Sequence, residues 1–108
     1  MATEQTDRVL ELVVFTLKGG TTRDQVLGTV DAVSEWVRTQ PGFLSRELTH
    51  AADEDKWVEI LYWRSMEEAK AAGAAAETSA DCAPMFSLID MDTMLFLHAV
   101  PVLQTATA

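Results

Sequence analysis

The segment Lys56–Arg64 constrains the fold most, because its pattern predicts a β-strand that runs directly into a helix. Its side chains alternate between two largely apolar faces, which is typical of a central strand covered on both sides. One face carries Trp57, Trp63 and the carboxylate of Glu59. An ionised carboxylate is costly to bury without a partner. Either this face opens onto a cavity, or Glu59 has a partner there.

The rest of the chain predicts one domain, residues 1–108, with a core over about 8–100 and flexible ends. Capping boxes at Thr22–Gln25 and Ser65–Glu68 predict the starts of two helices, the second ending near Ala76. Further strands are expected at 8–18, 43–50 and 92–100, with one or two helical turns between 79 and 90.

This order of elements is strand, helix, strand, strand, helix, strand. It favours an α+β fold of the ferredoxin-like split βαβ type, in which helices cover one face of a four-stranded antiparallel sheet. The strand at 43–50 is the most polar, which indicates an edge or interface position. A chain of 108 residues is too short to cover the second face of the sheet, so we expect a homodimer that packs sheet to sheet.

Charge and cysteine content exclude several classes of function. The net charge of −9 and pI of about 4.4 argue against nucleic acid and anionic membranes as partners. Cys82 is the only cysteine, so no internal disulfide can form. The apolar run 94–103 is too short to span a bilayer, and residues 1–8 lack the apolar region of a signal peptide. We therefore expect a cytoplasmic protein.

Three motifs together resemble the antibiotic biosynthesis monooxygenase family. They are the turn Pro41–Phe43 before a strand, the strand Trp57–Trp63, and the helix start Ser65–Ala69. The resemblance covers about residues 8–100. It implies a dimeric α+β barrel in which each subunit keeps a pocket between its sheet and its helices.

The resemblance also implies an activity. Some members oxygenate phenols or quinols of aromatic polyketides with molecular oxygen, and they use neither metal nor flavin. In those members the tryptophan matched by Trp63 lies in the pocket, and an asparagine that helps to hold the substrate stands where this chain has Glu59. Other members degrade haem with an asparagine and a helix histidine. This chain has no asparagine and no histidine between Ser65 and Ala80, which disfavours haem degradation.

Glu59 and Trp63 are the predicted catalytic residues. Beside tryptophan, the pKa of Glu59 should rise toward neutrality, so that Glu59 takes a phenolic proton as a general base. The resulting electron-rich anion would react with oxygen without a cofactor. The structural alternatives for Glu59 are a pairing with Arg46 or Arg64, or a position that reaches solvent.

Four further residues are candidates for substrate binding: Trp57, Trp36, Phe15 and His98. Trp57 and Trp63 would form an aromatic wall for a flat ligand. The alternative for each aromatic residue is core packing, and for His98 a satisfied core or interface position. His50 and His98 are the only histidines, and without a facing carboxylate cluster they do not indicate a metal site. We expect no cofactor and no metal.

Three functions remain open from the sequence. The first is a cofactor-independent monooxygenase acting on a small aromatic. The second is a non-catalytic small-molecule-binding or accessory protein with the same pocket. The third is a polyketide cyclase or isomerase that needs only proton transfer at Glu59.

Overall fold

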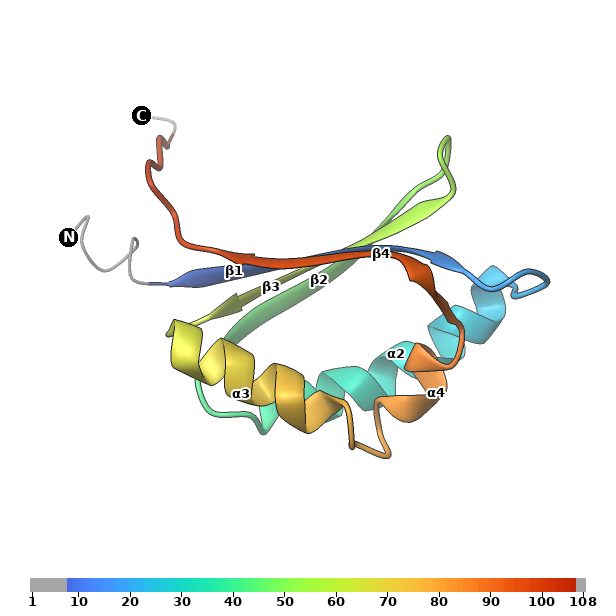
Figure 1. Cartoon of the computed structure of the whole chain (residues 1–108), viewed down its shortest axis with the longest axis horizontal. Coiled ribbons are helices and arrows are strands. Elements are labelled where there is room, and N and C mark those ends of the chain that lie inside the picture. Colours follow the sequence, from blue (N-terminus) through green and yellow to red (C-terminus); the bar gives the residue numbers. More distant parts are fainter. Residues whose placement is uncertain (1–7, 107–108) are drawn as a thin grey trace.

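The computed structural model describes residues 8–106, so the predicted flexible lead at residues 1–7 lies outside the described part. It has four strands and three helices (Figure 1). In chain order these are β1 (Val9–Leu17), α2 (Arg23–Arg38), β2 (Phe43–Ala51), β3 (Lys56–Trp63), α3 (Met66–Ala76), α4 (Ala83–Phe86) and β4 (Ile89–Ala99). Within residues 8–106, no helix has the length and apolar character needed to cross a bilayer.

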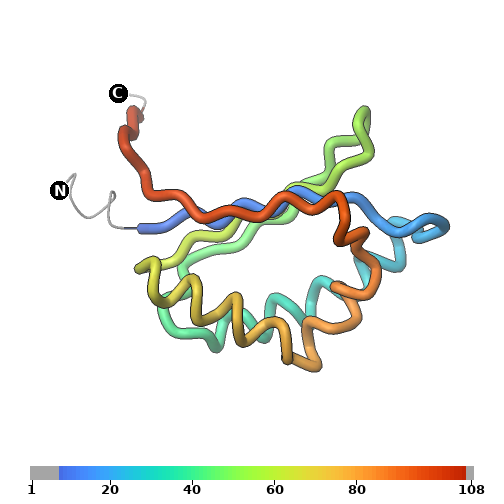
Figure 2. The backbone as a smooth tube through the Cα atoms, viewed as in Figure 1, coloured from blue at the N-terminus to red at the C-terminus, as the bar shows by residue number. Residues whose placement is uncertain are grey.

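The strands form one antiparallel sheet in the order β2-β3-β1-β4. β1 and β3 are central and β2 is an edge strand, as predicted. The helices lie together on one side of the sheet, and the turn between β2 and β3 extends to the other side (Figures 1 and 2). The predicted α+β ferredoxin-like fold is confirmed.

Alternation along the central strands sets the two faces of the sheet. In β1, Val9, Val13 and Phe15 are buried beneath the helices, while Leu10 and Leu12 point to the opposite face and are half-buried. The expectation that the central strands are covered on both sides is therefore met on one side only within this chain. The opposite face is apolar and open, with Leu95 50% and Leu97 37% exposed on β4.

Two irregularities in the sheet differ from the simple alternation. A shift between Phe43 and Ser45 places Phe43 on the helix side, where its ring meets Trp63 edge-on at 5.7 Å. A bulge there reverses the alternation, so Phe43 and Ser45 lie on opposite faces of the sheet. A second shift, between Val14 and Thr16, lets β4 continue pairing back to Ile89, so β4 begins earlier than predicted.

The two predicted capping boxes are not equivalent. Around Thr22 the box is complete, because the Thr22 hydroxyl accepts from the Gln25 N–H and the Gln25 side chain accepts from the Thr22 N–H. At α3 the Ser65 hydroxyl also accepts from the Glu68 N–H, at 3.1 Å. The Glu68 carboxylate, however, accepts from the Ser65 hydroxyl instead of the Ser65 backbone. Only half of this second box forms.

We predict that Gly42→Ala destabilises the fold by about 2 kcal/mol. Gly42 has φ +82°, and a Cβ there would lie 2.7 Å from the Cβ of Glu68 on α3. Gly19→Ala is the matched control, because a Cβ at Gly19 meets nothing within 4 Å; its free energy of unfolding should change by less than about 0.5 kcal/mol. Urea unfolding of both variants measures the difference, and equal losses would contradict the prediction.

Candidate functional site

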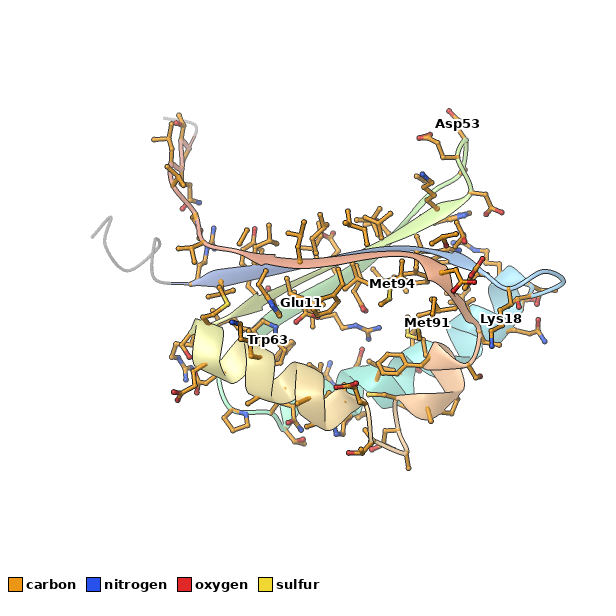
Figure 3. The ribbon with its side chains drawn as sticks, viewed as in Figure 1. Glu11, Lys18, Asp53, Trp63, Met91 and Met94 are labelled. Carbon is orange, nitrogen blue, oxygen red and sulfur yellow. The ribbon has the colours of Figure 1, made fainter. Side chains whose placement is uncertain are left out.

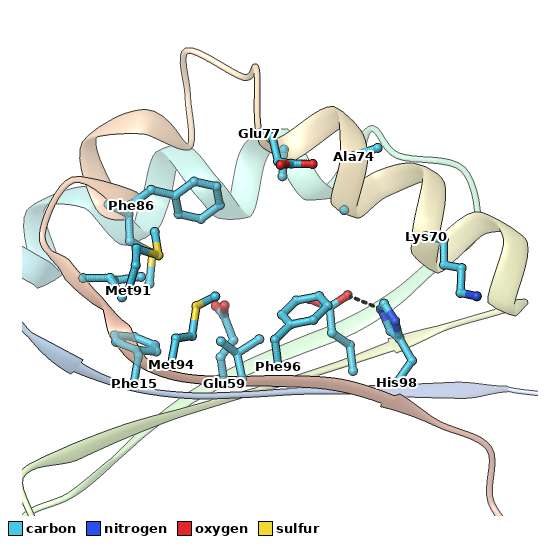
Figure 4. A pocket seen from close by; sticks show the side chains of 16 residues that line it. Phe15, Glu59, Lys70, Ala74, Glu77, Phe86, Met91, Met94, Phe96 and His98 are labelled. Carbon is cyan, nitrogen blue, oxygen red and sulfur yellow. Dashed lines mark hydrogen bonds and ion pairs between the residues drawn. The ribbon is translucent and has the colours of Figure 1, made fainter.

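A cavity of about 580 Å³ lies between the sheet and helices α3 and α4 (Figure 4). Most of its surface is apolar. Its lining residues are Glu11, Val13, Phe15, Glu59, Lys70, Gly73, Ala74, Ala76, Glu77, Met85, Phe86, Ile89, Met91, Met94, Phe96 and His98. On α3, Ala69 and Ala72 pack closely against the sheet, whereas Gly73, Ala74 and Ala76 border the cavity. Small side chains on α3 therefore give both close packing and open space.

Glu59 both faces the cavity and has a partner, so both alternatives drawn from the sequence are true. Its carboxylate accepts from Nε of Arg46, and the two side chains are only 13% and 7% exposed. Arg46 also donates to the Ser34 hydroxyl at 2.8 Å and to the Val30 carbonyl at 3.1 Å. The general-base hypothesis assumed an unpaired carboxylate, and the Arg46 ion pair removes that premise.

The three tryptophans are not among the lining residues. The buried residues form two core clusters. Trp63 is buried in one of them, with Val9, Val37 and Ala69. Trp57 is buried with Phe15 in the other core cluster, and its ring stacks on His50 at 4.3 Å.

Trp36 packs against both core clusters. The predicted tryptophan wall was wrong in this respect, because side chains of α2 and α3 fill the space over both ends of β3. Phenylalanine and methionine form the cavity wall instead.

A buried polar group that the sequence analysis did not single out lies at the same cavity. The Glu11 carboxylate accepts from Nε1 of Trp63 at 3.0 Å and lies 3.2 Å from Nε2 of His98 (Figures 3 and 4). Glu11 and His98 are direct partners across β1 and β4. Burial raises the pKa of Glu11, although the hydrogen bonds from His98 and Trp63 lower it in part. One signal was available, namely an acid at an inward position between Val9 and Val13.

The structure thus brings together three of the predicted site residues. Glu59, Phe15 and His98 line the cavity. Trp63 touches this group only through Glu11. Among residues 8–106, no three His, Cys, Asp or Glu side chains gather as a metal site would require. Cys82 is buried, and burial raises the pKa of its thiol, which opposes a nucleophilic role.

Comparison with solved structures shows what this arrangement resembles. SnoaB, a cofactor-independent oxygenase from Streptomyces nogalater, is 18% identical with a TM-score of 0.68, covering 93% of this chain and 96% of SnoaB. The ActVA-Orf6 monooxygenase of Streptomyces coelicolor, solved with nanaomycin D, is 22% identical with a TM-score of 0.75, covering 98% and 97%. The chain has the fold of the antibiotic biosynthesis monooxygenases.

The same fold extends to proteins without an assigned activity. A dimeric ferredoxin-like protein of unknown function from Thermobifida fusca is 13% identical with a TM-score of 0.69, covering 87% of this chain and 91% of that one. The sequence itself matches no protein-family model and no curated protein. At these identities the likeness concerns the fold, and the activity has to be argued from the cavity.

We predict that Arg46→Met costs about 3–5 kcal/mol of unfolding free energy, because it leaves Glu59 buried without its partner. Replacing both residues, as Arg46→Met with Glu59→Met, should recover most of that loss, since two apolar side chains of similar volume need no pairing. Urea unfolding of the four proteins at one protein concentration measures the coupling. Losses that simply add would show that the two residues do not stabilise one another.

We predict that wild type loses stability relative to Glu11→Gln as the pH rises. Burial raises the folded-state pKa of Glu11 above its usual 4.5, so the folded protein binds this proton more tightly than the unfolded chain. The stabilisation is complete below 4.5 and is lost as the pH rises through the raised pKa. Urea midpoints across this pH range measure the effect. Glu67→Gln, on an exposed part of α3, is the control and should run parallel to wild type.

Proposed function

We propose that this protein is a cofactor-independent monooxygenase that acts on a small aromatic phenol or quinol, of the polyketide type. The observation that carries the proposal is the cavity itself. Its volume of about 580 Å³ suits a small ligand, and apolar walls with a few converging polar groups are typical of such sites. The fold shared with SnoaB and ActVA-Orf6 supports the same reaction class.

The reaction needs an electron-rich anion next to oxygen in a site with little water. The substrate hydroxyl loses its proton, and the anion reduces O2. One oxygen atom becomes a quinone carbonyl of the product, and the other leaves as water with two substrate hydrogens. In this proposal Phe15 and Phe86 hold the ring, and Glu59, fixed by Arg46, orients a substrate hydroxyl.

The tryptophans act from behind the cavity wall in this proposal. Trp63 fixes Glu11 through its N–H, and Trp57 and Trp36 support the wall by packing.

A second copy of the chain completes the proposed assembly. The open face of the sheet carries Leu12, Ile60, Leu95 and Leu97, which a twofold partner would bury to close the predicted barrel. The dimeric protein of the same fold from Thermobifida fusca supports this arrangement.

The experiment uses dithranol, an anthrone with phenolic hydroxyls, as the substrate probe. We expect O2 uptake faster than spontaneous oxidation, and one atom of isotopically labelled O2 in the quinone product. Nanaomycin D, the ligand of ActVA-Orf6, serves as a binding probe through the quenching of tryptophan fluorescence.

Gly73→Trp should lower kcat/KM about tenfold or more, because the added ring would enter the cavity from α3. Ala75→Trp is the matched control, since Ala75 is exposed on the same helix and is not among the lining residues. Binding without O2 uptake would favour an accessory protein. Product formation without O2 uptake would favour an isomerase.

A further inference from the structure

We propose that the imidazole of His98, held by Glu11, is the group that takes the proton from the substrate hydroxyl. The inference rests on the proposed function of the same cavity and adds a catalytic residue to it. It assigns the proton transfer to a pair formed between β1 and β4, and not to Glu59 on β3.

The pair is positioned by the sheet. Glu11 and His98 stand directly opposite each other in the β1–β4 register, on the face that points to the helices. Both side chains are nearly buried, at 11% and 13% exposed, and both line the cavity. Phe96 meets the His98 ring edge-on, with centroids 5.1 Å apart and planes at 88°. The ring is therefore fixed in place and faces the cavity (Figure 4).

The hydrogen-bond pattern determines which nitrogen is free. The indole N–H of Trp63 can only donate, so Oε1 of Glu11 acts as an acceptor in that bond. An ionised carboxylate also only accepts, and the His98 nitrogen that contacts it, Nε2, must then carry the hydrogen. Across residues 8–106, Glu11 is the sole hydrogen-bond partner of the His98 ring. Nδ1 is left as an acceptor for a guest hydroxyl.

The other charged groups around the cavity are either already paired or suited to a different task. Glu59 on β3 is held by Arg46 on β2. On α3, Lys70 lies at the same end of the cavity as His98, where its ammonium would stabilise a phenolate (Figure 4). Glu77, near the other end of α3, also lines the cavity. Glu59 is therefore bound to a guanidinium, whereas Glu11 is bound to an imidazole, which can accept a proton.

The step itself is a simple proton transfer. The O–H bond of the phenol breaks, and an N–H bond forms on Nδ1 of His98. The products are a phenolate and an imidazolium, whose charge the Glu11 carboxylate balances. An imidazole oriented by a carboxylate is a recurrent general base. The phenolate then reduces O2, and the imidazolium returns its proton to the water that forms.

The pKa of Glu11 is consistent with this role. Burial raises that pKa, so Glu11 becomes protonated at a higher pH than an exposed carboxyl does. Protonation removes the charge that balances the imidazolium. Proton transfer should therefore weaken as the pH falls.

The test measures proton transfer from a bound phenol that need not be oxygenated. Umbelliferone is a phenol whose neutral and anionic forms absorb differently, and its methyl ether has no proton to lose. Wild type should bind umbelliferone as the anion, with at least tenfold more anion relative to neutral probe than in buffer at the same pH. His98→Gln should lose this enrichment and still bind the methyl ether, while Glu11→Gln should lose part of it.

His50→Gln is the matched control, because His50 is the other histidine and lies outside the cavity. It should ionise the probe as wild type does. Glu59→Gln changes the group that orients the hydroxyl, so it should weaken binding of the probe and still keep the anion enrichment of the probe that binds. The proposal is overturned if His98→Gln ionises the probe as wild type does, or if only Glu59→Gln loses ionisation. It is also overturned if wild type binds neither umbelliferone nor its methyl ether.

Failure of the oxygenase proposal has a separate signature. If ionisation of umbelliferone depends on His98 but dithranol causes no O2 uptake, the role of His98 as proton acceptor is supported and the oxygenase proposal is rejected. If dithranol causes O2 uptake but His98→Gln leaves ionisation unchanged, the oxygenase proposal is supported and the role of His98 is rejected.

Discussion

The guanidinium of Arg46 connects four elements behind the cavity. It pairs with Glu59 on β3, donates to Val30 and Ser34 on α2, and lies 3.7 Å from the sulfur of Met85 on α4. Because both charges are nearly buried, each depends on the other for compensation of its lost hydration. An edge strand is thereby tied to a central strand and to the helix layer at one point. The same contacts hold α2 and α4 to the sheet beside Glu59, which lines the cavity.

The inner face of the sheet carries two carboxylates, and they are satisfied in different ways. Glu59 is neutralised by a cation, whereas Glu11 is held by an indole N–H and an imidazole. A guanidinium is a permanent charge, but an imidazole can gain and lose a proton near neutral pH. Two acids on neighbouring strands therefore have different chemical capacities. The fold can use one for fixing the structure and the other for moving a proton.

Local patterns in the sequence were enough to predict the fold. The alternation over Lys56–Trp63, the polar strand at 43–50 and the two helix starts each depend on neighbouring residues, and each was found at its predicted place. The site was harder, because it depends on register between distant strands. Glu11 and His98 are 87 residues apart, and nothing local indicates that they are partners.

The same limit explains the misplaced aromatic residues. Alternation identifies the face of a strand but not what packs above each position on it. Trp57 and Trp63 were correctly placed on one face of the strand with Glu59, yet α2 and α3 cover them. A bulge is equally hidden, and the one beside Phe43 reversed the side on which its ring lies.

The composition of α3 has a consequence for how such a protein changes its ligand over evolutionary time. Gly73, Ala74 and Ala76 border the cavity from a helix that is anchored to the sheet by other residues, Ala69 and Ala72. Leucine and methionine are nearly as compatible with a helix as alanine. Single substitutions at these three positions can therefore reshape the accepted molecule while the scaffold stays intact, so related chains with one backbone can diverge in the molecules they accept.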